Sequence, residues 1–144
     1  MNNFPDSHNE KKVMVFTDGA SRGNPGDSGI GVLILDSKGK RKELKNYLGK
    51  KTNNQAEYSA LILALENLTE LTEEEIIIHT DSQLMASQMN EKWKVKDDGL
   101  RILYSKAKQL SKQHKKLKII YIPRELNKEA DRLANDAINE YFND

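Results

Sequence analysis

The sequence predicts an α/β domain built on a mixed β-sheet, and three observations carry this prediction. The runs Val13–Phe16 and Ile76–Ile78 are continuous and apolar, which indicates strands buried on both faces, inside a sheet flanked by helices. Three strand-like segments come first along the chain, joined only by turns, and indicate an antiparallel run. Segments with apolar residues at helical spacing separate the later strands. Together these features predict helices packed on the faces of one sheet.

Composition limits the functions that this chain can have. Its 144 residues fit one domain with one sizeable core. We expect that domain over residues 11–144, behind a flexible polar tail at residues 1–10. The formal net charge of +1 excludes a strongly basic field over the whole molecule, so any nucleic-acid binding must rest on local clusters. A monomer is the default expectation.

Cysteine is absent from the sequence. This excludes a disulfide framework, a disulfide-linked partner and a thiolate metal site, and it fits a reducing compartment. Residues 1–10 lack the apolar core of a secretion signal, and no apolar run approaches the length that spans a membrane. The sequence therefore predicts a cytoplasmic protein without membrane contact.

The first part of the sheet is predicted as three antiparallel strands, over residues 12–18, 29–35 and 41–48. Between the first two, Gly19, Gly23, Pro25 and Gly26 predict a tight loop. This loop is either a plain hairpin connection or a segment whose small residues let the backbone of a ligand come close. Residues 36–40 predict the second hairpin loop.

The clearest helix is expected to begin after an Asn53 cap and to end at about Leu68. Its buried stripe is formed by Leu61, Ala64, Leu65 and Leu68. Glu57 stands four residues before Leu61 on that stripe. The helix dipole favours a glutamate near a helix start but does not explain this choice of face. A carboxylate on the core-facing side needs a partner.

The second part of the chain alternates strands and helices. Ser82 is expected to cap a short helix, and Asn127 to cap the last one, whose apolar face Asp131 borders. His79 lies inside a strand and is expected to be structural. The predicted elements are a strand at 75–80, a helix from 83 to about 90, a helix at 98–114, a strand at 117–122, a loop at 123–126 and a final helix to about 141.

Residues 91–96 form a basic connection that contains Trp93. Residues 92–118 hold ten Lys or Arg against two Asp. Trp93 either packs against the core, which we favour slightly, or contacts nucleic acid beside lysines that suit phosphates.

Asp18 and Asp81 each follow an apolar strand directly, in the same Thr-Asp pair. If the two strands are parallel neighbours, about 4.8 Å apart, both side chains meet at the ligand-binding edge of the sheet. Two carboxylates so close repel each other unless a cation lies between them. Glu57 and Asp131 come from helix starts at the same edge. Four carboxylates without a nearby Cys or His favour Mg²⁺, and two ions roughly 3.5–4 Å apart suit phosphoryl-transfer chemistry.

Five motifs resemble the successive signatures of type 1 ribonuclease H, in order and at family spacing from about Lys12 to Tyr141. They are Thr17-Asp18-Gly19-Ala20-Ser21, Gly23-Asn24-Pro25-Gly26, Thr52-Asn53-Asn54-Gln55-Ala56-Glu57, Thr80-Asp81-Ser82 and Asn127-Lys128-Glu129-Ala130-Asp131. Any one of them would be a weak signal, but five in register exclude chance.

The resemblance implies a ribonuclease H-like fold, with five mixed strands in the order 3-2-1-4-5, the first three antiparallel, and helices on both faces. It implies endonucleolytic hydrolysis of the RNA strand of RNA–DNA hybrids, with 5′-phosphate and 3′-hydroxyl ends. Asp18 and Asp81 would contact two Mg²⁺ ions, for which Mn²⁺ is an alternative. Asp131 would contact chiefly the ion on the water side, and Glu57 the other ion and a 2′-hydroxyl.

Further family positions concern substrate binding. Asn24, Asn54 and Gln83 match residues that reach the minor groove, where 2′-hydroxyls distinguish RNA from DNA. Thr52 and Asn54 match a pocket for a phosphate of the DNA strand. Turn and cap chemistry alone would also explain these residue types, but the aligned motifs favour the substrate role.

Two departures from the family pattern affect the prediction. Many relatives carry a long basic protrusion where this chain has only Lys92–Lys96, so hybrid affinity is expected to be lower and more sensitive to salt. Many also carry a His in the loop before the last Asp, whereas no His follows His114 here. Our hypothesis is that Arg124 takes over part of that role by contacting the scissile phosphate.

Three alternatives stay open on the sequence alone. The first is a non-catalytic module on the same fold that binds RNA or a hybrid, although it would gain nothing from four acids facing phosphates. The second is a two-metal DNA nuclease of the integrase kind, against which the 2′-hydroxyl contacts argue. The third is a small-molecule phosphatase or a signalling receiver, whose sheet would lack the three antiparallel strands.

Overall fold

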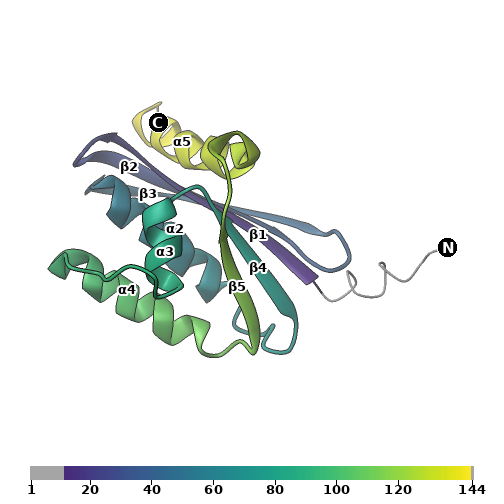
Figure 1. Cartoon of the computed structure of the whole chain (residues 1–144). Helices are drawn as coiled ribbons and strands as arrows, with labels where there is room; N and C mark the ends of the chain where they lie inside the picture. The colour runs from purple at the N-terminus through teal and green to yellow at the C-terminus, as the bar shows by residue number, and fades with distance from the viewer. Residues whose placement is uncertain (1–11, 144) are drawn as a thin grey trace.

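A computed structural model describes residues 12–143 as one five-stranded sheet with helices on both faces (Figure 1). The strand order is β3-β2-β1-β4-β5, with β1–β2 and β2–β3 antiparallel and β1–β4 and β4–β5 parallel. This confirms the predicted fold. The predicted tail at residues 1–10 lies outside the described residues. The elements are β1 (Lys12–Gly23), β2 (Gly26–Leu35), β3 (Arg41–Lys51), α2 (Asn53–Glu66), β4 (Glu75–Thr80), α3 (Gln83–Met89), α4 (Asp98–Ser111), β5 (Lys116–Tyr121), the 3₁₀ turn η1 (Arg124–Leu126) and α5 (Lys128–Asn143).

The predicted loop at residues 19–26 was wrong, because most of it is strand. β1 runs to Gly23 and pairs with β2 in register from Met14–Leu35 to Gly23–Gly26, which leaves only Asn24 and Pro25 as the turn. Of the glycines in this stretch, Gly19 allows α2 to approach the sheet. A Cβ on Gly19 would lie 2.4 Å from the backbone carbon of Ala56 in α2.

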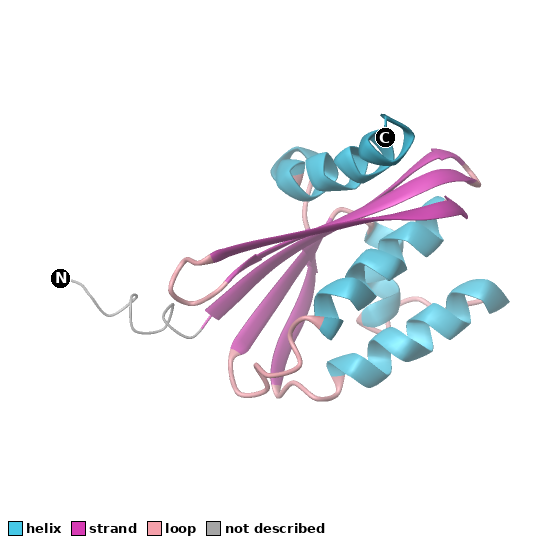
Figure 2. Ribbon diagram, turned by 180° about the vertical axis from the view of Figure 1, so that it is seen from behind, coloured by secondary structure: helices cyan, strands magenta, loops and turns pink. Residues whose placement is uncertain are grey.

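Helices α2, α3 and α4 cover one face of the sheet, and α5 lies on the other (Figure 2). Apolar side chains from β1, β2 and β4 pack against α2 to form the main core, with members that include Val15, Val32, Ile78, Leu61 and Leu65. α2 begins one residue earlier than expected. Its cap is Thr52, whose hydroxyl accepts from Gln55 N–H while the Gln55 side chain accepts from Thr52 N–H. This reciprocal pair satisfies backbone donors at the helix start.

Helix α5 packs closely on β2 because the strand carries glycine under it. A Cβ on Gly31 would lie 2.3 Å from the carbonyl oxygen of Ala130. The buried side chains of α5 are Ala130, Leu133, Ala134, Ala137 and Ile138. Its apolar spacing predicts these and Tyr141, but Tyr141 is 58% exposed, so that part of the prediction was wrong. The short 3₁₀ turn η1 replaces the predicted loop before it. This close packing brings the first turn of α5, with Asp131, to the sheet.

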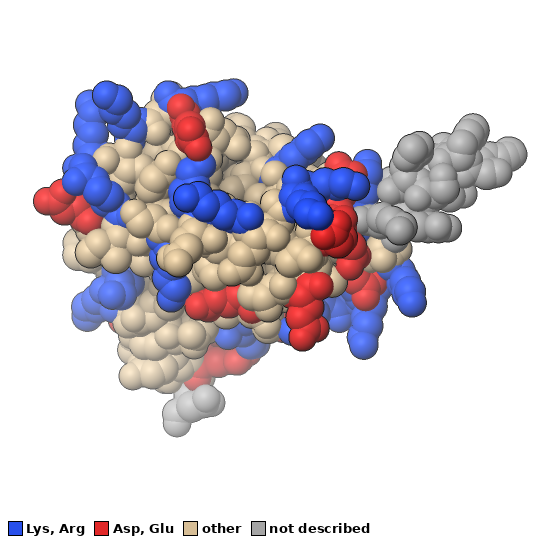
Figure 3. Space-filling model, turned by 90° about the horizontal axis from the view of Figure 1, so that it is seen from below, with Lys and Arg blue, Asp and Glu red and all other residues tan. Residues whose placement is uncertain are grey.

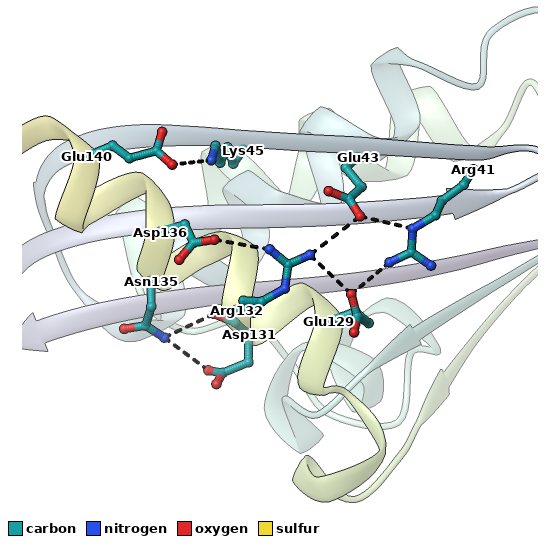
Figure 4. Close-up of polar contacts among 9 residues, drawn as sticks. All are labelled: Arg41, Glu43, Lys45, Glu129, Asp131, Arg132, Asn135, Asp136 and Glu140. Atoms are coloured by element: carbon teal, nitrogen blue, oxygen red, sulfur yellow. Dashed lines mark hydrogen bonds and ion pairs between the residues drawn. The ribbon is translucent and has the colours of Figure 1, made fainter.

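Charged side chains join the outer surface of α5 to β3 (Figure 4). Arg132 binds Glu43, Glu129 and Asp136, and Arg41 binds both Glu43 and Glu129. Lys45 and Glu140 form another pair between these elements. Single exposed pairs contribute little, but a shared network restrains α5 on the sheet edge.

Charges of both signs are interspersed on the face seen from below (Figure 3). This face therefore carries no field of a single sign, which agrees with the net charge of +1. Among residues 12–143, no helix combines the length and the apolar character that crossing a membrane requires.

Candidate active site

The first two acids lie where the parallel pairing of β1 with β4 ends, on two neighbouring strands in the middle of the sheet. Thr17 of β1 pairs with Thr80 of β4, so Asp18 and Asp81 follow at equivalent positions. Their carboxylates and that of Glu57 offer oxygens that all lie within 4.8 Å of one another. The expected convergence of strand ends therefore occurs, and α2 adds a third acid to it.

Glu57 reaches this group from the second turn of α2 because the helix lies against β1. The N–H of Gly19 donates a hydrogen bond to Glu57 Oε1 at 3.2 Å. Glu57 is 9% exposed, on the buried side of α2 where the sequence placed it. Gly19 therefore serves twice: it lacks the Cβ that would push α2 away, and its N–H fixes one carboxylate oxygen.

Without a bound cation, the ionised forms of these carboxylates are unfavourable in the folded protein. Burial, followed by the charges of Asp81 and Asp131, raises the pKa of Asp18 to about 8. Burial and the charges of Asp18 and Asp81 raise the pKa of Glu57 well above its usual range. A divalent cation among these oxygens would offset the repulsion and favour the ionised forms. The all-oxygen donor set and its unfavourable negative charge thus fit a hard cation such as Mg²⁺.

Asp131 lies on the wall of the same cavity, which has a volume of about 470 Å³ and is lined also by Arg22 and Asn53. It stands outside the group of three carboxylates within 4.8 Å, although its charge helps to raise the pKa of Asp18. Asn135, one turn further along α5, donates to Asp131 Oδ1 at 3.3 Å (Figure 4). Arg22 donates in turn to Asn135 Oδ1 at 3.2 Å. This chain of contacts orients Asp131 from the side of β1.

Sequence reasoning missed Arg22 and Asn135. The signals that could have found them were a cation four residues after Asp18 and an amide four residues after Asp131, one helical turn away. Neither spacing predicts a contact between the two residues until the position of α5 over β1 and β2 is known.

Asn127 has a different role from the predicted cap. Its side chain is fully buried, and its amide nitrogen donates to the carbonyl oxygen of Thr17 at 2.9 Å and to Asp81 Oδ2 at 3.1 Å. Among the described residues its Oδ1 has no hydrogen-bond partner. Asn127 therefore joins the start of α5 to the ends of β1 and β4.

The residues predicted to bind substrate, Asn24, Thr52, Asn54 and Gln83, do not line the cavity of the acids, although Asn53 between two of them does. Asn24, Asn54 and Gln83 are exposed. Asn24 Oδ1 accepts from the N–H of Asn53 at 3.0 Å, which ties the β1–β2 turn to the start of α2. Thr52 is occupied in part by capping α2. Their contacts with nucleic acid stay a prediction.

Arg124 and Trp93 occupy different places. Arg124 lines the cavity of the acids, together with Tyr121. Trp93 is 47% exposed, so the favoured interpretation as a core residue was wrong. It lies in the connection between α3 and α4. His79 is structural as predicted, since its ring stacks on Phe16 at 4.2 Å and its Nδ1 bonds to the Val15 carbonyl at 2.8 Å.

Comparison with known proteins identifies the family. A family model described as "Reverse transcriptase-like" matches residues 16–137. Ribonuclease HI of Halobacterium salinarum is 39% identical over 130 residues, which cover 90% of this chain and 65% of that protein. The chain belongs to the type 1 ribonuclease H family. The crystal structure of RNase H1 from the same archaeon covers 90% of this chain and 98% of its own, with 38% identity and a TM-score of 0.84.

Two further members of this family are informative. LC11-RNase H1, whose structure was determined in complex with an RNA/DNA hybrid, has 40% identity and a TM-score of 0.85, over 90% of this chain and 99% of that one. The bifunctional protein Rv2228c of Mycobacterium tuberculosis is 41% identical over 130 residues, which cover 89% of this chain. Those residues are 36% of Rv2228c, so this chain spans about a third of the length of that relative.

Proposed function

We propose that this chain is an endoribonuclease that hydrolyses the RNA strand of RNA–DNA hybrids and leaves 5′-phosphate and 3′-hydroxyl ends. The observation that carries the proposal is the convergence of Asp18, Glu57 and Asp81 within 4.8 Å, in a cavity that also holds Asp131. Support comes from membership of the ribonuclease H family and from the hybrid bound to LC11-RNase H1. A polar cavity open at the sheet edge suits a polymeric phosphodiester better than a small enclosed ligand.

The proposed cofactor is Mg²⁺, two ions per site when substrate is bound, with Mn²⁺ as an alternative. When bound, the pair would activate a water for attack and stabilise the departing 3′-oxygen. Asp18 and Asp81 would hold both ions, Glu57 and Asp131 one each. Asn127 restrains one oxygen of Asp81, and the N–H of Gly19 restrains one oxygen of Glu57. Asp81 and Glu57 would thus keep their positions when substrate binds. This would lower the free-energy cost of arranging the acids for reaction.

Substrate selection is proposed to rest on polar residues outside the cavity, three of which are exposed. Asn24, Asn54 and Gln83 would test the minor groove for 2′-hydroxyls, and Thr52 with Asn54 would hold a phosphate of the DNA strand. Short polar side chains suit this task because sequence need not be read. Arg124 would meet the scissile phosphate from the wall of the cavity.

One experiment tests the proposal and its alternative. Labelled RNA–DNA hybrid, double-stranded RNA and double-stranded DNA are incubated with the protein in Mg²⁺, Mn²⁺ or EDTA. We expect cleavage of hybrid RNA with either metal and none in EDTA. Asp18→Asn should abolish cleavage and leave hybrid binding, because it removes a metal ligand with little change of shape. Binding without cleavage by the wild-type protein would instead support the non-catalytic module. The monomeric state and the cytoplasmic location stay predictions.

A further inference from the structure

One wall of the acid cavity carries a chain of three polar side chains, Arg22, Asn135 and Asp131. The guanidinium of Arg22, near the end of β1, donates to Asn135 Oδ1 at 3.2 Å. The amide nitrogen of Asn135, one turn after Asp131 in α5, donates to Asp131 Oδ1 at 3.3 Å (Figure 4). In the part of the chain that the structure describes, Arg22 forms no ion pair with an acid. Its guanidinium is therefore bonded to a neutral amide, beside a cavity that holds four carboxylates.

The side-chain amide of Asn135 is held in one orientation. Its nitrogen also donates to the backbone carbonyl oxygen of Asp131 at 3.0 Å, so both ends of the amide group are bonded. An amide presents its acceptor and its donors in different directions, and only the oxygen can accept from a guanidinium. With the oxygen bonded to Arg22, the nitrogen faces Asp131. Arg22 therefore fixes the donor that binds the Asp131 carboxylate.

A second asparagine makes the same two structural bonds away from the acids. Asn67, directly after α2, donates through Nδ2 to the Leu63 carbonyl oxygen four residues earlier, at 2.8 Å. Its Oδ1 accepts from Lys42 of β3 at 3.1 Å. Joining a helix to a cation on a strand thus needs only these two bonds. The bond to Asp131 Oδ1 is what Asn135 adds, and its acceptor is an acid of the candidate site.

We infer that Asn135 and Arg22 are positioning residues for Asp131 in the cleavage of hybrid RNA. The inference rests on the proposed function. Asp131 is the acid that stands outside the group of three carboxylates within 4.8 Å. Among residues 12–143, only Asn135 donates to the Asp131 side chain, at Oδ1, and Oδ2 is left for a cation. A carboxylate that already holds the reactive orientation needs no rearrangement during the reaction, so this bond acts on the rate of cleavage rather than on hybrid affinity.

Asn135→Asp separates the positioning role from a structural one. The new carboxylate keeps the size of the amide and still accepts from Arg22, but it repels Asp131 instead of donating to it. We expect kcat for the hybrid to fall about tenfold or more, with KM kept within about twofold. Asn67→Asp is the matched control, because it keeps the bond from Lys42 and should leave both constants unchanged. A wild-type kcat in Asn135→Asp, or an equal fall in both variants, would overturn the inference.

Arg22 is tested through its own variants. Arg22→Ala should lower kcat about threefold to tenfold with KM within about twofold, and Arg22→Lys should restore most of the rate, because an ammonium can also donate to Asn135. In Asn135→Ala, the further change Arg22→Ala should have no effect on kcat, since the two residues act as one chain. Equal effects of Arg22→Ala in both backgrounds would show that Arg22 acts without Asn135 and would overturn its positioning role. A rise in KM alone would mark Arg22 as a substrate contact and would overturn that role as well.

A measurement without metal or substrate separates this inference from the proposed function. In EDTA at neutral pH, the ¹³C resonance of the Asp131 side-chain carboxyl is compared among the variants. Arg22→Ala should shift this resonance in the wild-type background and not in Asn135→Ala, because Asn135 carries the effect. A resonance that Arg22→Ala leaves in place would overturn the inference even if the protein cleaves hybrid RNA. Wild-type protein that leaves the hybrid whole in Mg²⁺ and Mn²⁺ would refute the proposed function, while the resonance would still report whether Arg22 orients Asp131 through Asn135.

Discussion

The buried amide of Asn127 donates a hydrogen bond to Asp81 Oδ2 at 3.1 Å, although the two residues are 46 positions apart. The same nitrogen donates to the Thr17 carbonyl oxygen, next to Asp18. The carbonyl oxygen of Asn127 accepts from the N–H of Asp131 in the first turn of α5. Through its side chain and its backbone, this one residue connects three elements that carry acids of the candidate site, and the side chain joins two of them, β1 and β4, where their parallel pairing ends.

Asn127→Ala should destabilise the protein by about 1–3 kcal/mol, because it leaves a buried carbonyl and a carboxylate oxygen without their donor. Cleavage should fall as well, since Asp81 and the backbone of β1 next to Asp18 lose the side chain that joins them. Urea unfolding and single-turnover cleavage measure the two effects. Asn67→Ala, which removes an amide bond to the Leu63 carbonyl at the end of α2, is the control and should change stability alone. Equal loss of activity in both variants would contradict the anchoring role.

Gly19→Ala should destabilise the protein by about 1–3 kcal/mol or more, because its Cβ would overlap the backbone of α2 and push Glu57 away. Activity should fall further than stability explains, since the N–H that restrains Glu57 moves too. Gly99→Ala, whose Cβ would meet Asp97 Oδ1 at 3.3 Å at the exposed start of α4, is the control and should be close to neutral. Thermal melts and cleavage rates decide between these outcomes.

The raised pKa values predict how stability depends on pH without metal. Burial raises the pKa of Asp18 to about 8, above the ordinary value of 3.8, so the folded state favours the protonated form. The stabilising contribution is complete below pH 3.8 and is lost as the pH rises through about 8. In EDTA, Asp18→Asn should therefore raise the melting temperature, and more at pH 8 than at pH 5.

Mg²⁺ or Mn²⁺ should stabilise the wild-type protein more at pH 8 than at pH 5, because binding requires ionised carboxylates. This increment should shrink in Asp18→Asn. Calorimetric melts of both proteins, with metal and with EDTA, measure it. A metal-independent melting temperature in the wild type at pH 8 would argue against a cation among these carboxylates.

Arg124→Ala should slow cleavage by about tenfold or more and leave hybrid affinity nearly unchanged, if the guanidinium acts on the scissile phosphate in the transition state. Arg124→Lys should restore only part of the rate, since an ammonium lacks the planar pair of donors. Single-turnover rates beside equilibrium binding separate the two effects. A variant that cleaves at the wild-type rate would remove Arg124 from the proposed mechanism.

The sequence by itself determined the elements of the sheet and the acids at its edge. β4 has the predicted bounds, Asp18 and Asp81 follow apolar strands, and Glu57 lies on the buried stripe of α2. These features could be predicted because strand and helix periodicity are local and because the motif spacing is unambiguous. They sufficed to indicate both the fold and the chemistry.

Only the tertiary structure decided which residues support those acids. The bonds from Asn127 to Asp81 and from Arg22 to Asn135 join residues 46 and 113 positions apart. The strand character of residues 19–23 depends on pairing with β2, and the exposure of Trp93 depends on how α3 and α4 pack. Such contacts leave no periodic signal, because they arise where elements cross, and the crossing is set by the packing of the whole core.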